Sequence, residues 1–278
     1  MIAISLSLIA CLCWGMSQFL AGIKTRTLPV LTLMAYTSTA GFMVLATGLG
    51  VMGSPMPRDP NLFYAVLAGA MGIGGVYSLY RGLAVGAISI VIPISSLCAL
   101  LPVIASLIMG EIPGAVQGIG MVAALSGGVL ISIPHHTGGQ VTPPVKGIIF
   151  AIGAALGFGG FFILMDVAGT GDPLWAAAVS RLASFILVMC AVLWKGPKLK
   201  IKAAHLPVVF MIGALDTAAA FSYTVATTKG LLSLVAVISS LYPVVPVVLA
   251  TLFFKERLRG LQLPGVILII LGVMLIST

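Results

Sequence analysis

Charged residues are scarce in this sequence. They make up 7% of its 278 residues, whereas 60% of the residues are hydrophobic. Soluble domains carry about 25% charged residues. So little charge cannot cover the surface of a soluble domain of this length. We therefore predict a polytopic integral membrane protein and expect it in the cell (inner) membrane.

Acidic residues are rarer than basic residues. The sequence has 6 Asp and Glu against 14 Lys and Arg, which gives a net charge of +8. The basic residues lie in short connecting segments and not on one continuous face, so we expect them to contact anionic lipid headgroups and not nucleic acid. The predicted partners are membrane lipids and a small-molecule substrate. The sequence leaves open whether the protein is a monomer or a homodimer.

Residues that usually carry catalysis are also few. The sequence has 3 His and 4 Cys, without a carboxylate at the spacing of a catalytic triad or a metal site. A glycine-rich phosphate loop with its lysine is missing as well, which argues against ATP-driven transport by this chain. We predict no catalytic residue, no metal and no cofactor. An intramembrane enzyme is the weakest of the functional alternatives.

Ten apolar segments account for most of the chain. Each is long enough for a transmembrane helix, which needs about 20 residues, and too long for a barrel strand. Their approximate ranges are 2–22, 29–52, 62–84, 86–111, 114–133, 147–167, 173–194, 206–228, 230–256 and 261–277. The longest polar linker, 135–146, separates a first half, 1–134, from a second half, 147–278.

The two halves share a pattern. Ser-Ser-Leu at 95–97 is followed by Pro102, and Ser-Ser-Leu at 239–241, 144 positions later, is followed by Pro246. We interpret this as an internal duplication. Five helices per half is an odd number, so the two copies enter the membrane in opposite senses. The predicted fold is all-α, with ten transmembrane helices as two inverted five-helix repeats, an architecture typical of secondary transporters that work by alternating access.

Prolines interrupt the fourth and ninth helices. A proline lacks the backbone N–H and clashes with the preceding turn, so each helix should be kinked or locally opened. We expect these kinks to act as gates. The residues concerned are Pro93, Pro102, Pro243 and Pro246.

Charges within apolar helices are costly and usually face a cavity or a partner. Asp216 is therefore a candidate for a substrate cavity or a proton site, or else a structural hydrogen-bond partner. Arg181 has two interpretations: an ion pair with Asp166 or Asp216 that neutralises both groups, or a guanidinium offered to a substrate carboxylate. At the offset of 144 positions, Arg181 corresponds to Thr37 and Asp216 to Gly72.

Aromatic rings and hydroxyl groups beside the kinked helices are further candidates for substrate binding. An amphipathic ring with one hydroxyl suits a medium-sized organic solute, although the deeper tyrosines could equally be packing residues. These candidates are Trp14, Tyr77, Ser95, Ser96, Phe158, Tyr223, Ser239, Ser240 and Tyr242.

Further motifs are shared by the two halves. Each of the two proline helices ends in an acidic residue, in Met-Gly-Glu at 109–111 and Phe-Lys-Glu at 254–256. The aromatic-glycine step Trp14-Gly15 is echoed at Phe158-Gly159. With these motifs the sequence resembles the drug/metabolite transporter superfamily, in particular its EamA-type members. The resemblance implies an exporter of small metabolites such as amino acids. A passive channel or facilitator for small polar solutes is the alternative.

The two indications of membrane orientation conflict. Eleven Lys and Arg fall in the loops after odd-numbered helices and two in the loops after even-numbered helices. Basic residues in short loops favour the cytoplasm, which would place both termini outside. The resemblance implies that both termini are cytoplasmic.

Overall fold

The computed structural model describes residues 1–25, 27–85, 91, 94–132, 145–197, 199–246, 248–249 and 261–278. Within these ranges the chain forms helices and no strand. The first half contributes α1 (Ile2–Lys24), α2 (Val30–Met52), α3 (Leu62–Val85), η1 (Leu97–Ala99), α5 (Leu100–Ile108) and α6 (Ala115–Ser132). The second half contributes α7 (Val145–Gly169), α8 (Pro173–Lys195), η2 (Ala203–His205), α9 (Leu206–Thr227), α10 (Leu232–Ser240) and α12 (Gln262–Ile276).

Six of these helices are long and apolar enough to cross a membrane on their own: α1, α2, α3, α7, α8 and α9. The shorter apolar helices belong to the fourth, fifth, ninth and tenth spans. The protein thus has the predicted ten-helix architecture.

Local signals set some of the helix ends. The Asp172 carboxylate accepts hydrogen bonds from the first N–H groups of α8, at 2.9 Å from Leu174 N and 3.2 Å from Trp175 N, as a helix cap should.

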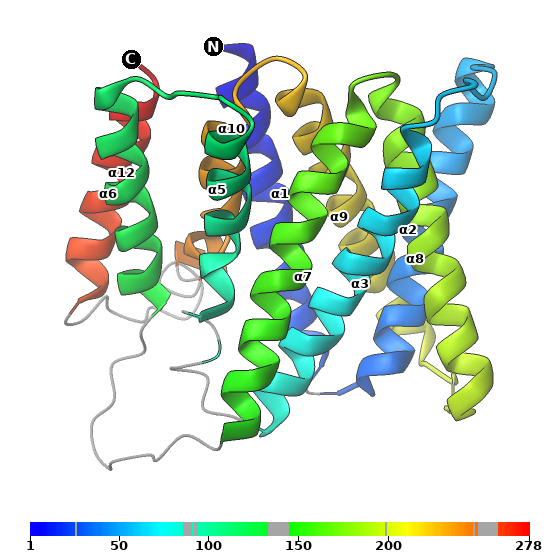
Figure 1. Cartoon of the computed structure of the whole chain (residues 1–278). Coiled ribbons are helices and arrows are strands. Elements are labelled where there is room, and N and C mark those ends of the chain that lie inside the picture. The colour runs from blue at the N-terminus through cyan, green and yellow to red at the C-terminus, as the bar shows by residue number, and fades with distance from the viewer. Residues whose placement is uncertain are drawn as a thin grey trace, which may run out of the picture.

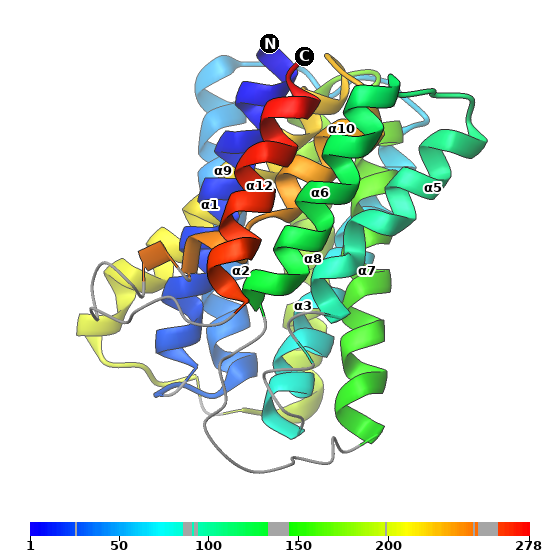
Figure 2. The ribbon, with the colours of Figure 1, turned by 90° about the vertical axis from the view of Figure 1, so that its left-hand side faces the viewer.

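The two repeats run in opposite senses. In Figure 1, α1 begins at the end of the bundle where both termini lie, and α7, its counterpart in the second repeat, begins at the opposite end. The packing partners exchange accordingly: α1 packs against α9 and α10, whereas α7 packs against α3 and α5. The fifth helix, α6, pairs with its own counterpart α12 at one edge of the bundle (Figures 1 and 2). This exchange is what an inverted repeat requires.

Two glycines show the repeat at atomic detail. A Cβ at Gly15 would lie 2.7 Å from the carbonyl oxygen of Tyr242 and would overlap the side chain of Val245. A Cβ at Gly159 would lie 2.6 Å from the carbonyl oxygen of Cys98 and 2.8 Å from the Cβ of Leu101. Every residue of the second contact is the counterpart of one in the first at an offset of 144 positions. Only glycine allows α1 to approach the ninth helix, and α7 the fourth helix, this closely. Because their prolines interrupt them, the fourth and ninth helices are called the broken helices below.

The offset between equivalent residues of the two repeats falls from 144 to 143 positions in the second helix of each repeat. A Cβ at Gly69 would collide with the carbonyl oxygen of Ser180, and one at Gly213 with the carbonyl oxygen of Thr37. Gly213 lies 144 positions after Gly69, but Ser180 lies only 143 positions after Thr37. The counterpart of Arg181 is therefore Ser38, and the pairing with Thr37 expected from a constant offset is wrong.

The fourth and ninth helices are interrupted at equivalent positions, as their prolines predicted. The first copy tightens into the 3₁₀ turn η1 at residues 97–99 before α5 begins. The second copy leaves the α-helical pattern at residues 241–243, where Val244 N and Val245 N bond to carbonyl oxygens only three residues earlier, at 3.0 and 3.2 Å. Pro102 is buried, and Pro243 and Pro246 are half-buried. Pro93 and the acidic Glu256 lie outside the described residues.

The glycine contacts yield a stability prediction. Gly15→Ala should destabilise the protein by about 1–3 kcal/mol, because the added methyl group overpacks the contact with the broken ninth helix. Gly22→Ala is the matched control in the same helix, since a Cβ added there would meet no atom within 4 Å, and it should leave stability unchanged or raise it by up to about 1 kcal/mol. Thermal unfolding in detergent measures both variants. Equal shifts in the two midpoints would contradict the contact.

Candidate functional site

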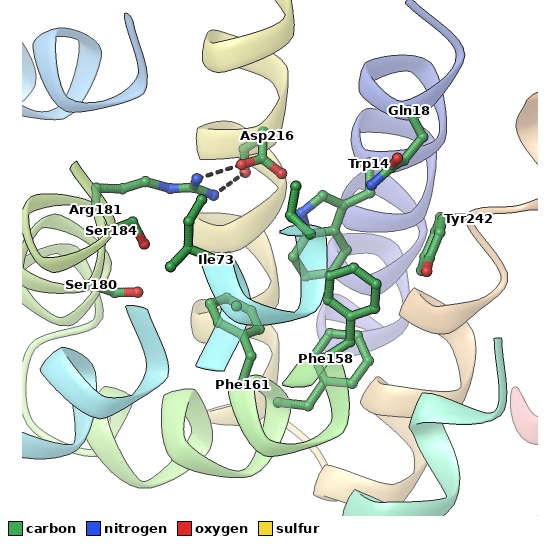
Figure 3. Close-up of a pocket in the computed structure, with 13 residues that line it drawn as sticks. Trp14, Gln18, Ile73, Phe158, Phe161, Ser180, Arg181, Ser184, Asp216 and Tyr242 are labelled. Carbon is green, nitrogen blue, oxygen red and sulfur yellow. Dashed lines mark hydrogen bonds and ion pairs between the residues drawn. The ribbon is translucent and has the colours of Figure 1, made fainter. Parts of the chain in front are cut away.

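A cavity opens near the middle of the bundle (Figure 3). About 620 Å³ of empty space lies between the residues that line it, and part of this space is open to the surroundings. Its lining residues come from α1, α3, α7, α8, α9 and the segment after α10, and so from both repeats. They lie near the middle of their helices. The cavity is thus at the depth and between the repeats where transporter sites of this architecture lie.

One wall of the cavity is charged. Arg181 on α8 forms an ion pair with the carboxylate of Asp216 on α9 through Nη1 and Oδ2. The Arg181 Nη2 also donates a hydrogen bond to the backbone carbonyl oxygen of Asp216 at 2.7 Å. The sequence left open which acid would pair with Arg181, and the structure selects Asp216 over Asp166. The Asp216 side chain is 32% exposed and that of Arg181 is 15% exposed, so the carboxylate is the more accessible partner.

The hydroxyl groups of Ser180 and Ser184 and the amide of Gln18 also line the cavity. Ser184 Oγ donates a hydrogen bond to the Gly69 carbonyl oxygen at 3.0 Å. The sequence did not single out these residues, because they carry no charge and belong to no motif shared by the repeats. Helical periodicity could have found them: Ser180 and Ser184 flank Arg181 on one helical face, and Gln18 follows Trp14 by one turn.

Another part of the cavity wall is aromatic. It is formed by Trp14, Phe158, Phe161, Phe162 and Tyr242. The Trp14 ring lies 6.1 Å from Phe161 and 5.5 Å from Phe162, centroid to centroid, and Phe158 meets Tyr242 edge to face at 6.5 Å. Phe161 and Phe162 were also missed, although they follow Phe158 at the three- and four-residue spacing of one helical face.

Tyr223 supports the aromatic wall from behind. Its side chain is fully buried, its ring stacks on Phe162 with centroids 4.6 Å apart, and its hydroxyl donates a hydrogen bond to the Phe162 carbonyl oxygen at 3.0 Å. It also lies 5.8 Å from the Trp14 ring. The structure therefore places Tyr223 in the layer that holds two of the lining rings.

The structure brings five of the predicted binding residues together around the cavity, namely Trp14, Phe158, Arg181, Asp216 and Tyr242. The others lie elsewhere. Tyr77 is exposed, with Lys195 Nζ 5.5 Å from its ring centroid. Buried hydroxyl groups lie in or beside the broken helices, on Ser95, Ser96, Ser239 and Ser240. A role in binding stays a prediction for all of these residues.

Two other acids lie away from the lining residues. Glu111, at the end of the fourth span, accepts a hydrogen bond from Leu232 N at 3.3 Å. Asp166, near the end of α7, faces Thr227. Over the part of the chain that the structure covers, no group of three or more His, Cys, Asp or Glu could hold a metal ion.

Comparison with known proteins agrees with this architecture. The model of the EamA-like transporter family matches the sequence twice, over residues 1–133 and 145–278. The chain belongs to the EamA-like transporter family. This EamA-like transporter also has the fold of a protein of known crystal structure, with a TM-score of 0.84 at 21% identity over 98% of this chain and 95% of that one. Comparison with curated proteins gives no significant match.

The family and the fold together make this chain an integral membrane transporter of small solutes built from two repeats. The double match coincides with the two halves that the contacts of Gly15 and Gly159 relate to each other. The charge pair does not follow the repeat, because the counterparts of Arg181 and Asp216 are Ser38 and Gly72. The charged residues of the site thus lie in one repeat only, and the repeated fold does not require them.

The ion pair yields a prediction of coupled stability. Arg181→Gln or Asp216→Asn alone leaves an unpaired charge in the membrane interior and should destabilise the protein by about 1–3 kcal/mol. This is less than the ~3–5 kcal/mol of fully buried pairs, because Asp216 is partly exposed. The double variant should be more stable than either single variant. Thermal unfolding of the three variants measures the coupling, and strictly additive losses would argue against it.

Proposed function

We propose that this EamA-like protein is a secondary active transporter of small organic metabolites in the cell (inner) membrane. The observation that carries the proposal is the central cavity, whose walls come from both inverted repeats at the middle of the bundle. Two inverted copies can exchange conformations about one such site, which gives alternating access. The resemblance to EamA-type exporters suggests export as the direction and amino acids as representative substrates.

The broken helices would serve as the gates of this exchange. Helix interruptions occur at equivalent places in the two repeats, at residues 97–99 and 241–243, close to the contacts of Gly159 and Gly15. Hinges are a few residues at the ends of structural elements that absorb changes in backbone angles. We therefore retain Pro93, Pro102, Pro243 and Pro246 as gating residues.

The cavity chemistry suits an amphipathic solute. Trp14, Phe158 and Tyr242 offer ring surface, while Arg181 and Asp216 offer charge. Asp216 is in addition the best candidate for coupling transport to protons, because its carboxylate faces the cavity. The remaining predicted binding residues would line the path that opens when the repeats move. They are Tyr77, Ser95, Ser96, Tyr223, Ser239 and Ser240.

Flux through purified protein in liposomes tests this function. A panel of small metabolites, with amino acids included, is assayed with and without a pH gradient. A carrier should show saturable flux and counterflow, in which unlabelled solute on one side accelerates entry of labelled solute from the other. Linear flux without counterflow would indicate a passive channel.

Asp216→Asn should remove the pH dependence if this carboxylate couples transport to protons, and unchanged pH-dependent flux would exclude Asp216 from that role.

Proline replacement tests the gates. Pro102→Ala and Pro246→Ala restore an N–H that can bond to the carbonyl oxygen four residues earlier, so each helix should straighten. We expect counterflow to slow by about tenfold, equivalent to about 1.4 kcal/mol in the barrier. Pro207→Ala is the matched control, because Pro207 sits in the first turn of α9, where no N–H is needed. Wild-type rates in both gate variants would show that the breaks are packing features.

A further inference from the structure

The cavity is suited to a substrate that carries a positive charge. We infer that it recognises a substrate through an ammonium group placed at Asp216 Oδ1, with an apolar or aromatic body against the ring wall, and that it needs no substrate carboxylate at Arg181. The substrate class is then an organic amine or an amino acid held by its amino group. This inference rests on the proposed transport function and narrows its substrate.

The guanidinium of Arg181 is already engaged. Its Nη1 pairs with Asp216 Oδ2 and its Nη2 donates to the Asp216 carbonyl oxygen at 2.7 Å. A substrate carboxylate would have to displace Asp216 or bind beside it, where it would face a like charge. The idea of a guanidinium free for a substrate anion, open at the level of sequence, therefore loses support.

The carboxylate of Asp216, by contrast, has an acceptor to spare. Within the part of the chain that is described, its Oδ1 receives no hydrogen bond, and its side chain is twice as exposed as that of Arg181. Figure 3 shows this oxygen pointing away from Arg181, on the side of Trp14. An ammonium group can donate to Oδ1 while Arg181 keeps its contacts with Oδ2 and the backbone. Such charge-assisted hydrogen bonds are about twice as strong as neutral ones.

The aromatic wall suits the same kind of ligand. A cation is attracted to the face of an aromatic ring, most strongly to tryptophan, and Trp14 lines the same cavity as Asp216 (Figure 3). The rings of Phe158, Phe161 and Tyr242 extend this surface for an apolar body. Among the described lining residues only Arg181 and Asp216 are charged, so a net anion finds no unpaired cation there.

Three matched probes test the inference: 2-phenylethylamine, 3-phenylpropionate and L-phenylalanine, which share a ring and a two-carbon chain and carry an ammonium, a carboxylate or both. Calorimetric titration of the purified full chain in detergent measures their binding. We expect the amine and the amino acid to bind at least about tenfold more tightly than the acid. Equal or tighter binding of the acid, or no binding of the amine, would overturn the inference.

Variants test whether Asp216 is responsible for the preference for an ammonium group. Because Asp216→Asn alone can impair folding, the double variant Arg181→Gln/Asp216→Asn, which leaves no unpaired charge, is titrated as well. It should lose amine binding by about tenfold or more while thermal unfolding shows that it is folded. Asp166→Asn, which removes an intramembrane carboxylate outside the cavity, is the matched control and should keep wild-type affinity for the amine. Unchanged amine affinity in the double variant would overturn the role of Asp216.

The failure of this inference is distinguishable from failure of the proposed function. Saturable flux and counterflow of a solute without an amino group, together with weak amine binding, would leave the transporter intact and remove the ammonium site. Absence of saturable flux for every solute of the panel would instead remove the transport function, whatever the three probes bind.

Discussion

A backbone carbonyl within a membrane must find a partner in the protein, and this constraint shapes the centre of the molecule. Pro102 and Pro246 have no N–H, so the carbonyl oxygens of Cys98 and Tyr242 lose the usual helical donor. The Tyr242 oxygen accepts instead from Val245 N at 3.2 Å. Irregular backbone at this depth is tolerated only where protein or a water-filled cavity covers it. Here α1 and α7 provide the cover, and they can come close enough only through Gly15 and Gly159.

This constraint links the fold to the site. The residues that precede the two close glycines, Trp14 and Phe158, project from the same turns that cover the broken helices, and both line the cavity. Tyr242, whose carbonyl oxygen faces Gly15, lines it too. The same contacts therefore bury the irregular backbone and place three of the cavity's rings. A change at either glycine should disturb both.

Much of the fold could be predicted because it depends on features that a sequence displays directly. Long apolar segments, a repeated Ser-Ser-Leu with its proline, and an odd number of helices per half were enough for the inverted repeats and for the position of the breaks. The shift from 144 to 143 positions was not predictable, because α2 and α8 share no motif by which to align them. The contacts of Gly69 and Gly213 with Ser180 and Thr37 reveal it.

The candidate site was predictable only where chemistry is conspicuous. Arg181 and Asp216 are visible as charges in apolar helices, but which acid pairs with Arg181 depends on how α7, α8 and α9 pack. Tyr223 and Tyr242 both lie within apolar segments, yet Tyr223 is buried behind Phe162 and Tyr242 lines the cavity. A hydropathy pattern separates lipid from interior, but it does not separate an interior packing position from a cavity wall.

The placement of the charge pair has a consequence for movement. Arg181 and Asp216 both belong to the second repeat, on α8 and α9, whereas the contacts of α1 with α9 and of α3 with α7 join the two repeats. Separating opposite charges in a medium of low dielectric constant is costly. A motion of one repeat against the other, if the proposed transport cycle uses one, would change the contacts between the repeats and could leave the ion pair joined. Among the described residues, the ion pair of the cavity therefore joins α8 to α9 within the second repeat and does not join one repeat to the other.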